Sequence, residues 1–461
     1  MQKLSNIADG IGKYLLAAVL IVVPLFPKFP LLTVPGTYVA IRAEDLLLLF
    51  LAVFTFIKVV PNIRNFLKDD IVKAFVIFFG VGAVSLFSGI FLTHTVDPNI
   101  GILHWARRIE YVVPFFAALT LLTRQKASQY LDFYIKIILI VIAVAFIYGV
   151  GQRYLNFPII VTQNEEYSKG VALRWTEGSH VNSTFGGHYD LAAYLVLTLP
   201  ILLSLLVILK DWASRIALFA VSGMGIWLLI ASISRIGQLA YFAALSVSLI
   251  LLKKFKALAI ILAISITLAG MSGSLGARFS RVIEVFYERT GIKDVIGDAR
   301  NGFAVNAQEF TLPASRNVNF VPTPTPVPVF EDRSTSIRLV VEWPRALRAL
   351  AKNPLIGTGY SSIGLATDND FLRMLGETGI LGLAAFALIF IRIGKEFVAK
   401  ALPVSKFKGV DSGFVAGIIG GVVGTFIFAT FIDIFEASKF ATMFWLMLGL
   451  GLFYLRSREY D

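Results

Sequence analysis

The 461-residue chain has no cysteine, four histidines and few charged residues. The absence of cysteine excludes disulfide bonds and thiolate metal sites, and the scattered histidines show no metal-ligand spacing. Charged residues make up only 16% of the chain, whereas hydrophobic residues make up 57% and the mean hydropathy is +0.76. A soluble globular domain typically has about 25% charged residues. The composition therefore indicates a polytopic membrane protein.

Long apolar runs recur along the whole sequence. A membrane-spanning helix needs about 20 mainly apolar residues, and twelve runs approach this pattern. The runs centre on Val22, Phe50, Phe79, Phe115, Ile140, Leu197, Ser222, Ala243, Ala263, Ala384, Val422 and Leu446. No signal-peptide cleavage site follows the first run, so we expect it to remain as a span. The predicted fold is an all-α polytopic membrane protein with about twelve transmembrane helices in a single transmembrane domain, residues 1–461.

Lysine and arginine are unequally distributed between the two sets of connections. One set carries twenty-one of them, and the alternate set carries nine when the long insert is set aside. Cytoplasmic loops carry the positive excess. We therefore expect both termini in the cytoplasm and extracytoplasmic loops over 151–187 and 271–373. The net charge of +12 reflects this topology and attraction to the inner leaflet, and no nucleic-acid partner is expected.

The large loop, 271–373, separates the ninth run from the tenth. Charges and aromatic residues in 278–302 suit a helix on the membrane surface. Alternating prolines in 321–330 favour an extended linker. A helix is then expected to begin at Ser334 or Thr335 as its N-cap.

That helix should end at Asn353, because a residue before proline disfavours the helical conformation. The two glycines of the following GTGY allow a tight turn. Asp368 or Asn369 then suits the N-cap of the tenth span.

Five arginines share the predicted extracytoplasmic side, and arginine binds phosphate oxygens bidentately. They are Arg107, Arg108, Arg174, Arg235 and Arg338. A lipid diphosphate in the outer leaflet is the ligand that this group predicts.

Each position also has a structural alternative. Arg235 can anchor a helix end by snorkelling, and Arg107 and Arg108 can pair with Glu110. For Arg338, the alternative is an ion pair with Glu342, four positions later in the same helix.

Several motifs occur together between residues 183 and 383. Arg338, Trp343, NPLIGTGY, DNDFL and ETGILGL resemble the core signature of the O-antigen ligase and O-antigen polymerase family. STFGGHYDLAAYL and SISRIGQLA resemble two further landmarks of that family. The motifs extend over about half of the chain in the order that the family shows.

The resemblance implies an all-helical, GT-C-like glycosyltransferase that needs no metal or other cofactor and uses an undecaprenyl-diphosphate-linked donor. It implies that Arg235 and Arg338 bind the diphosphate. Asp368 occupies the position where ligases usually have histidine, and we expect it to orient or deprotonate an acceptor hydroxyl. Its alternative role is a helix cap. Further predicted substrate-binding residues are Arg174, His188, Asn369, Arg107 and Arg108.

The function predicted from these features is polymerisation of lipid-linked oligosaccharide repeats at the outer face of the cytoplasmic membrane. The missing histidine favours a polymerase over the alternative, a ligase or protein glycan transferase. A flippase is disfavoured, because the large asymmetric insert and the absence of an evident repeat between halves differ from transporters. The expected partners are the lipid-linked oligosaccharide donor, a glycan or lipid acceptor, and the bilayer.

Overall fold

The computed structural model describes residues 2–34, 37, 40–160, 172–173, 175–271, 337–364 and 366–458. In this part of the chain, helices dominate and strands form only two short hairpins. The predicted surface helix, the linker 321–330, both candidate caps Ser334 and Thr335, and Arg174 lie outside the described residues.

Every one of the twelve predicted runs lies in a helix. The long helices are α1 (Gln2–Leu25), α2 (Ala43–Val59), α4 (Asp70–Phe91), α5 (Pro98–Leu121), α6 (Ala127–Tyr154), α8 (His188–Ile208), α9 (Trp212–Ala231), α10 (Arg235–Leu251), α11 (Phe255–Met271), α15 (Asp370–Ala401), α16 (Val410–Ala429) and α17 (Ser438–Ser457). Within the described ranges, eight helical segments are long and apolar enough to cross a membrane. The chain is thus a multi-pass membrane protein, and the count of twelve spans stays a prediction.

Short elements connect these helices. They are β1 (Pro30–Thr33), β2 (Ala40–Arg42), η1 (Val60–Asn62), α3 (Ile63–Phe66), η2 (Arg124–Lys126), β3 (Ile159–Ile160), β4 (Ala172–Leu173), η5 (Arg338–Glu342), α14 (Trp343–Lys352), η6 (Val404–Lys406) and η7 (Ile434–Glu436). β1 pairs with β2 and β3 with β4, both antiparallel, and neither hairpin was expected from the sequence.

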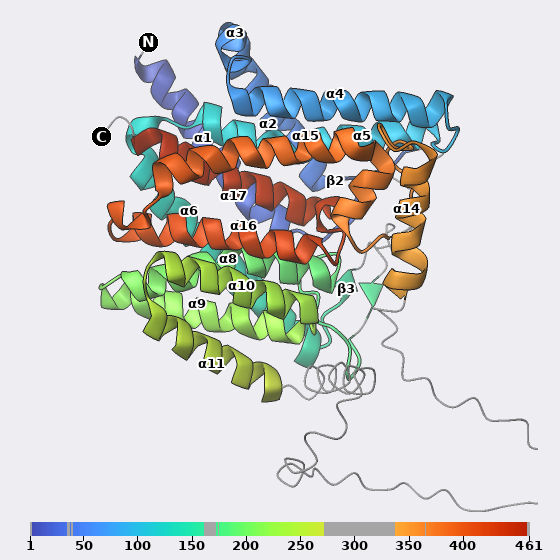
Figure 1. Cartoon of the computed structure of the whole chain (residues 1–461). Helices are drawn as coiled ribbons and strands as arrows, with labels where there is room; N and C mark the ends of the chain where they lie inside the picture. The colour runs from blue at the N-terminus through green and yellow to red at the C-terminus, as the bar shows by residue number, and fades with distance from the viewer. Residues whose placement is uncertain are drawn as a thin grey trace, which may run out of the picture.

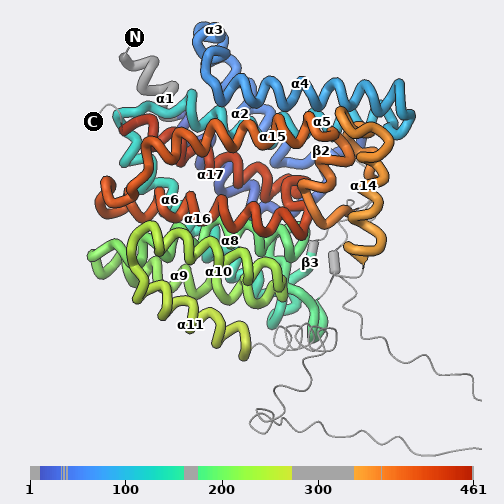
Figure 2. Tube along the Cα trace, viewed as in Figure 1, coloured from blue at the N-terminus to red at the C-terminus, as the bar shows by residue number. Residues whose placement is uncertain are grey.

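The long helices run side by side in one bundle (Figure 1). α1 begins and α17 ends at the same end of it. We call the opposite end, where α8, α10 and α15 begin, the distal end. The short helix α14 lies across the distal end, nearly perpendicular to the long helices, and packs against α15 (Figure 2). The part of the large loop that the structure describes is therefore fixed over the ends of the spans.

α17 lies at the centre of the bundle and is buried along its whole length. It packs against α5, α8 and α15. Large apolar side chains on the outer helices are exposed instead, among them Phe56 of α2, Phe87 of α4 and Ile264 of α11. A bilayer would cover such side chains, which is why exposed apolar residues on helices of this length indicate a membrane protein.

Small residues allow α16 to lie between α8 and α10. A Cβ atom on Gly417 would come within 2.4 Å of Cα of Ile201, and one on Gly420 within 2.3 Å of the carbonyl oxygen of Ala244. Membrane helices use such positions to bring backbones into contact, since lipid gives little hydrophobic driving force between helices. These contacts fix the distal start of α8 and α10 relative to the last helices of the chain.

Candidate active site

An ion pair joins the large loop to the start of α15. Nε and Nη2 of Arg338 donate to Oδ2 of Asp368 at 2.9 and 2.8 Å, and both side chains are largely buried. Arg338 begins η5, a π-helical turn closed by a bond from the Trp343 N–H to the Arg338 carbonyl. Turns of this type occur frequently at functional sites. The sequence suggested that Arg338 pairs with Glu342. In the structure, Arg338 instead pairs with Asp368.

Asn369, and not Asp368, caps α15. The Asn369 side chain accepts bonds from the N–H groups of Phe371 and Leu372, at 3.1 and 3.0 Å. Asp368 has φ of 50°, a left-handed conformation that aspartate tolerates better than most residues. This conformation places its carboxylate against Arg338, so the helix-cap alternative for Asp368 does not describe its contacts. Asn369 as a substrate-binding residue stays a prediction.

A buried aspartate in the last distal loop positions the segment around Asp368. Asp433 accepts bonds from the N–H groups of Thr367 at 2.6 Å and Asn369 at 2.8 Å. It also accepts a bond from Nη1 of Arg373 at 3.2 Å. The residues on both sides of Asp368 are thereby fixed to the same carboxylate. Asp433 was not predicted from the sequence, where its only signal is an acidic residue between two apolar runs.

The start of α8 reaches the same site. Burial acts to lower the pKa of Arg338, but Asp368 and Tyr189 outweigh it and the pKa is raised. Tyr189 therefore lies close to the guanidinium. Its ring also lies 4.0 Å, centroid to centroid, from that of His188, which stacks on His180 at 3.9 Å. The structure thus brings His188 to the edge of the site, and its role in binding stays a prediction.

Arg107 and Arg108 are held by protein groups elsewhere in the distal half. Nη2 of Arg107 donates to the carbonyl of Ala40 at 2.7 Å and lies 3.7 Å from Oδ2 of Asp45. Arg108 donates to the carbonyl of Phe435 at 3.0 Å and forms an ion pair with Glu436. These contacts take the place of the pairing with Glu110 that the sequence suggested. Substrate binding by either arginine stays a prediction.

Arg235 is the first residue of α10 at the distal end. Ser234 caps this helix by accepting a bond from the Gly237 N–H at 3.0 Å, and Arg235 is half-buried. The position suits an anion-binding group, because the positive end of the helix dipole lies there. The described contacts do not link Arg235 to Arg338, so their joint action on one diphosphate stays a prediction.

NPLIGTGY and ETGILGL form one structural unit. α15 is broken at Gly379, where φ is 68°. The N–H groups of Thr358 and Gly359 bond to the carbonyls of Gly376 and Glu377 at 3.0 and 2.8 Å. On the far side of the break, the Ile380 N–H bonds to the carbonyl of Pro354 at 2.9 Å. Backbone groups freed inside a membrane protein need such partners, so the segment before α15 stabilises the break.

Gly357 gives a direct test of this unit. Its φ is 70°, and an added Cβ would lie 2.4 Å from the backbone of Glu377. We expect Gly357→Ala to lower the melting temperature of the purified protein clearly, because a left-handed alanine costs about 1–2 kcal/mol before the clash is counted. Gly364→Ala is the matched control, since among the described residues beyond its chain neighbours no atom lies within 4 Å of its added Cβ. Equal melting temperatures for the two variants would contradict the close packing.

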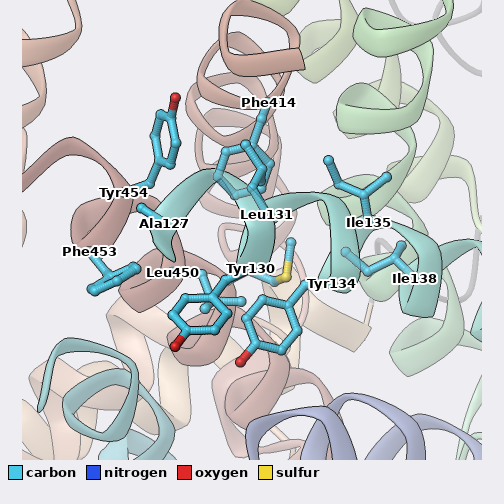
Figure 3. A pocket seen from close by; sticks show the side chains of 11 residues that line it. Ala127, Tyr130, Leu131, Tyr134, Ile135, Ile138, Phe414, Leu450, Phe453 and Tyr454 are labelled. Carbon is cyan, nitrogen blue, oxygen red and sulfur yellow. The ribbon is translucent and has the colours of Figure 1, made fainter. Parts of the chain in front are cut away.

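Two cavities lie in the part of the chain that the structure describes, and they differ in character. One is small and is lined by charged side chains, among them Arg108, Asp370, Arg373, Glu377 and Glu436. The cavity in Figure 3 is lined by aliphatic and aromatic side chains of α6, α16 and α17, among them Tyr130, Phe414 and Leu450. It lies near the end of the bundle that holds the termini, and no ionised group lines it. Across the described residues, no group of three or more histidine, aspartate or glutamate side chains is placed to hold a metal ion. We take the Arg338–Asp368 pair as the centre of the candidate site, because it joins the large loop to the start of α15.

Comparison with known families agrees with this location. Residues 219–387 match the family model described as O-antigen ligase. The chain carries an O-antigen ligase domain. The domain includes Arg235, α14, the start of α15 and both members of the Arg338–Asp368 pair. It supports a membrane enzyme of the O-antigen ligase or polymerase type that transfers glycans. No curated protein matches the sequence significantly.

Proposed function

We propose that the protein polymerises oligosaccharide repeat units linked to undecaprenyl diphosphate, at the outer face of the cytoplasmic membrane. Both termini then lie in the cytoplasm, and the loops 151–187 and 271–373 lie outside. The observation that supports this proposal is the Arg338–Asp368 pair, which holds a guanidinium group at the distal end within the O-antigen ligase domain.

The proposed reaction is a single displacement. The acceptor hydroxyl oxygen attacks the anomeric carbon of the donor, the bond from this carbon to the diphosphate breaks, and the diphosphate leaves with the electron pair. Arg338 and Arg235 stabilise the charge that develops on the leaving group, as guanidinium groups in a water-poor site do well. Asp368 fixes the fork of Arg338 and orients the acceptor. The configuration at the anomeric carbon inverts, and the scheme uses no metal ion.

The second candidate is a ligase or protein glycan transferase, which would use the same donor with a different acceptor. Asp368 in place of the histidine that ligases usually carry favours the polymerase. A transporter is disfavoured because the Arg338–Asp368 ion pair lies at the distal end of the bundle. Transporters bind their substrates near the middle of the membrane.

The test is incubation of the purified protein with an undecaprenyl-diphosphate-linked repeat unit from its own source, with products resolved by mass. A ladder of lengthened lipid-linked glycans, absent with Asp368→Ala, is expected. Transfer that occurs only after a lipid-core, protein or polymer acceptor is added would identify a ligase. An unchanged donor under all these conditions would exclude the proposed reaction.

Arg235→Lys should lower turnover in this assay by about 100-fold, because the charge remains but the bidentate fork is lost. Arg215→Lys, at an exposed position of α9, is the control with the same chemical change and should keep wild-type activity. Both variants should accumulate normally. Wild-type turnover by Arg235→Lys would mean that Arg235 only anchors the end of its helix.

A further inference from the structure

Glu342 closes η5, four residues after Arg338, and one oxygen of its carboxylate has no bonded partner among the described residues. Within the described residues, Oε2 of Glu342 is buried and makes no hydrogen bond. The next side chains show the same feature, since Nε1 of Trp343 and Nη1 of Arg345 are buried without a partner in this part of the chain. A buried polar group without a partner costs about 1–3 kcal/mol, more when charged. Three such groups along one short stretch indicate that a polar ligand supplies their hydrogen bonds.

The charged neighbours of Glu342 include groups that bond to residues other than Glu342. Arg338, Arg345, Asp368 and Asp433 are the charged groups around it. Arg338 directs two N–H groups to Asp368, so its fork is engaged with a different carboxylate. Asp433 is likewise bonded to the backbone on both sides of Asp368. Among the described residues of this cluster, Glu342 is therefore the carboxylate with a buried oxygen that makes no hydrogen bond.

The two carboxylates also differ in basicity. Burial, together with the nearby carboxylate of Asp368, raises the pKa of the Glu342 carboxyl to about 7, although Arg338 acts to lower it. Burial raises the pKa of Asp368 as well, but Arg338 opposes that shift through charge and hydrogen bonds. A general base is most effective when its pKa lies near the working pH. Glu342 meets this condition at neutral pH.

We propose that Glu342 is the general base of the glycan transfer, and this inference rests on the proposed function. As the acceptor oxygen forms its bond to the anomeric carbon, its proton passes to Oε2 of Glu342, while the diphosphate leaves with the electron pair of the broken bond. The proton then goes to water, which restores the carboxylate. Asp368 acts as a positioning residue for Arg338. Trp343 and Arg345 donate hydrogen bonds to the acceptor sugar.

The experiment measures kcat and KM for transfer between pH 5 and 9 with wild type, Glu342→Gln and Glu342→Asp. Because the base acts as the carboxylate, wild-type activity should be low below pH 7, rise through about pH 7 and level off above it. Glu342→Gln should lower kcat by about 100-fold or more, within the range found for general bases, with KM for the donor unchanged. It should also lose the rise near pH 7. Glu342→Asp should keep that rise with reduced kcat.

Glu177→Gln is the matched control, because it removes an exposed glutamate at the distal end by the same change. Its pH profile should equal that of the wild type. A Glu342→Gln protein with the wild-type kcat and the same rise near pH 7 would overturn the inference and leave the proposed function intact. A variant that loses affinity for the donor while kcat is kept would also overturn it. A wild type inactive with every acceptor would refute the proposed function itself, and the inference with it.

Discussion

Replacing Arg338 with lysine is expected to lower kcat/KM for glycan transfer by about 100- to 1,000-fold, the cost of removing one preorganised stabilising group. Lysine keeps the positive charge, but a single ammonium group cannot reproduce the rigid pair of donors, Nε and Nη2, that converge on one oxygen of Asp368. The charge would then be less well fixed at the distal end. The loss should therefore appear in kcat as well as in donor affinity.

The matched control is Arg348→Lys, at an exposed position of α14 ten residues after Arg338. A double-mutant cycle adds a second readout. If Arg338 and Asp368 act as one unit, Arg338→Lys combined with Asp368→Asn should cost little more than the worse single change. Added guanidinium should partly restore Arg338→Ala, whereas added ammonium should not. Additive losses without guanidinium rescue would contradict a shared role.

Much of the helical framework was readable from the sequence because its causes are local. A residue before proline disfavours the helix, and α14 does end at Lys352, immediately before Asn353. An asparagine before an apolar run suits an N-cap, and Asn369 caps α15. The glycines of GTGY do take positive φ, as a tight turn requires. Each of these features depends on a few neighbouring residues.

The partners within the candidate site were not readable in this way. The Arg338–Asp368 pair joins residues 30 positions apart, and Asp433 reaches the Asn369 N–H across 64 positions. Sequence spacing identifies only nearby residues as partners, so it suggested Glu342 as the partner of Arg338. The π-helical turn and the placement of α14 across the bundle instead direct the arginine to the start of α15.

The same limitation concealed the link between two motifs. NPLIGTGY predicted a turn and ETGILGL predicted part of a span. In the structure, the first motif supplies the N–H groups and the carbonyl that the broken backbone of the second requires. A break in the middle of an apolar run leaves little trace in hydropathy, because Gly379 is flanked by a helix on both sides. The motifs occur together because neither is stable in this form without the other.

Asp433→Asn should damage both stability and activity. Asp433 uses one oxygen for the Asn369 N–H and the other for the Thr367 N–H and Arg373. Asparagine has one acceptor oxygen, so its NH₂ group would replace one of these two oxygens. That NH₂ group would then face either the Asn369 N–H or the donors of Thr367 and Arg373, and a donor cannot accept a hydrogen bond from another donor. Breaking a buried ion pair on one side costs about 3–5 kcal/mol. The segment that carries Asp368 would also shift, and small misplacements of this kind can cost about 100-fold in rate.

Asp97→Asn tests whether this loss is specific to the buried position. Asp97 caps α5 at the distal end by accepting bonds from the N–H groups of Asn99 and Ile100, and it is exposed. Asparagine caps a helix about as well as aspartate, so this variant should keep the wild-type melting temperature and turnover. For Asp433→Asn we expect a clear fall in melting temperature and, below that temperature, a residual turnover near one hundredth of wild type. Unchanged turnover would mean that the bonds from Asp433 to the backbone on both sides of Asp368 do not set the position of Asp368.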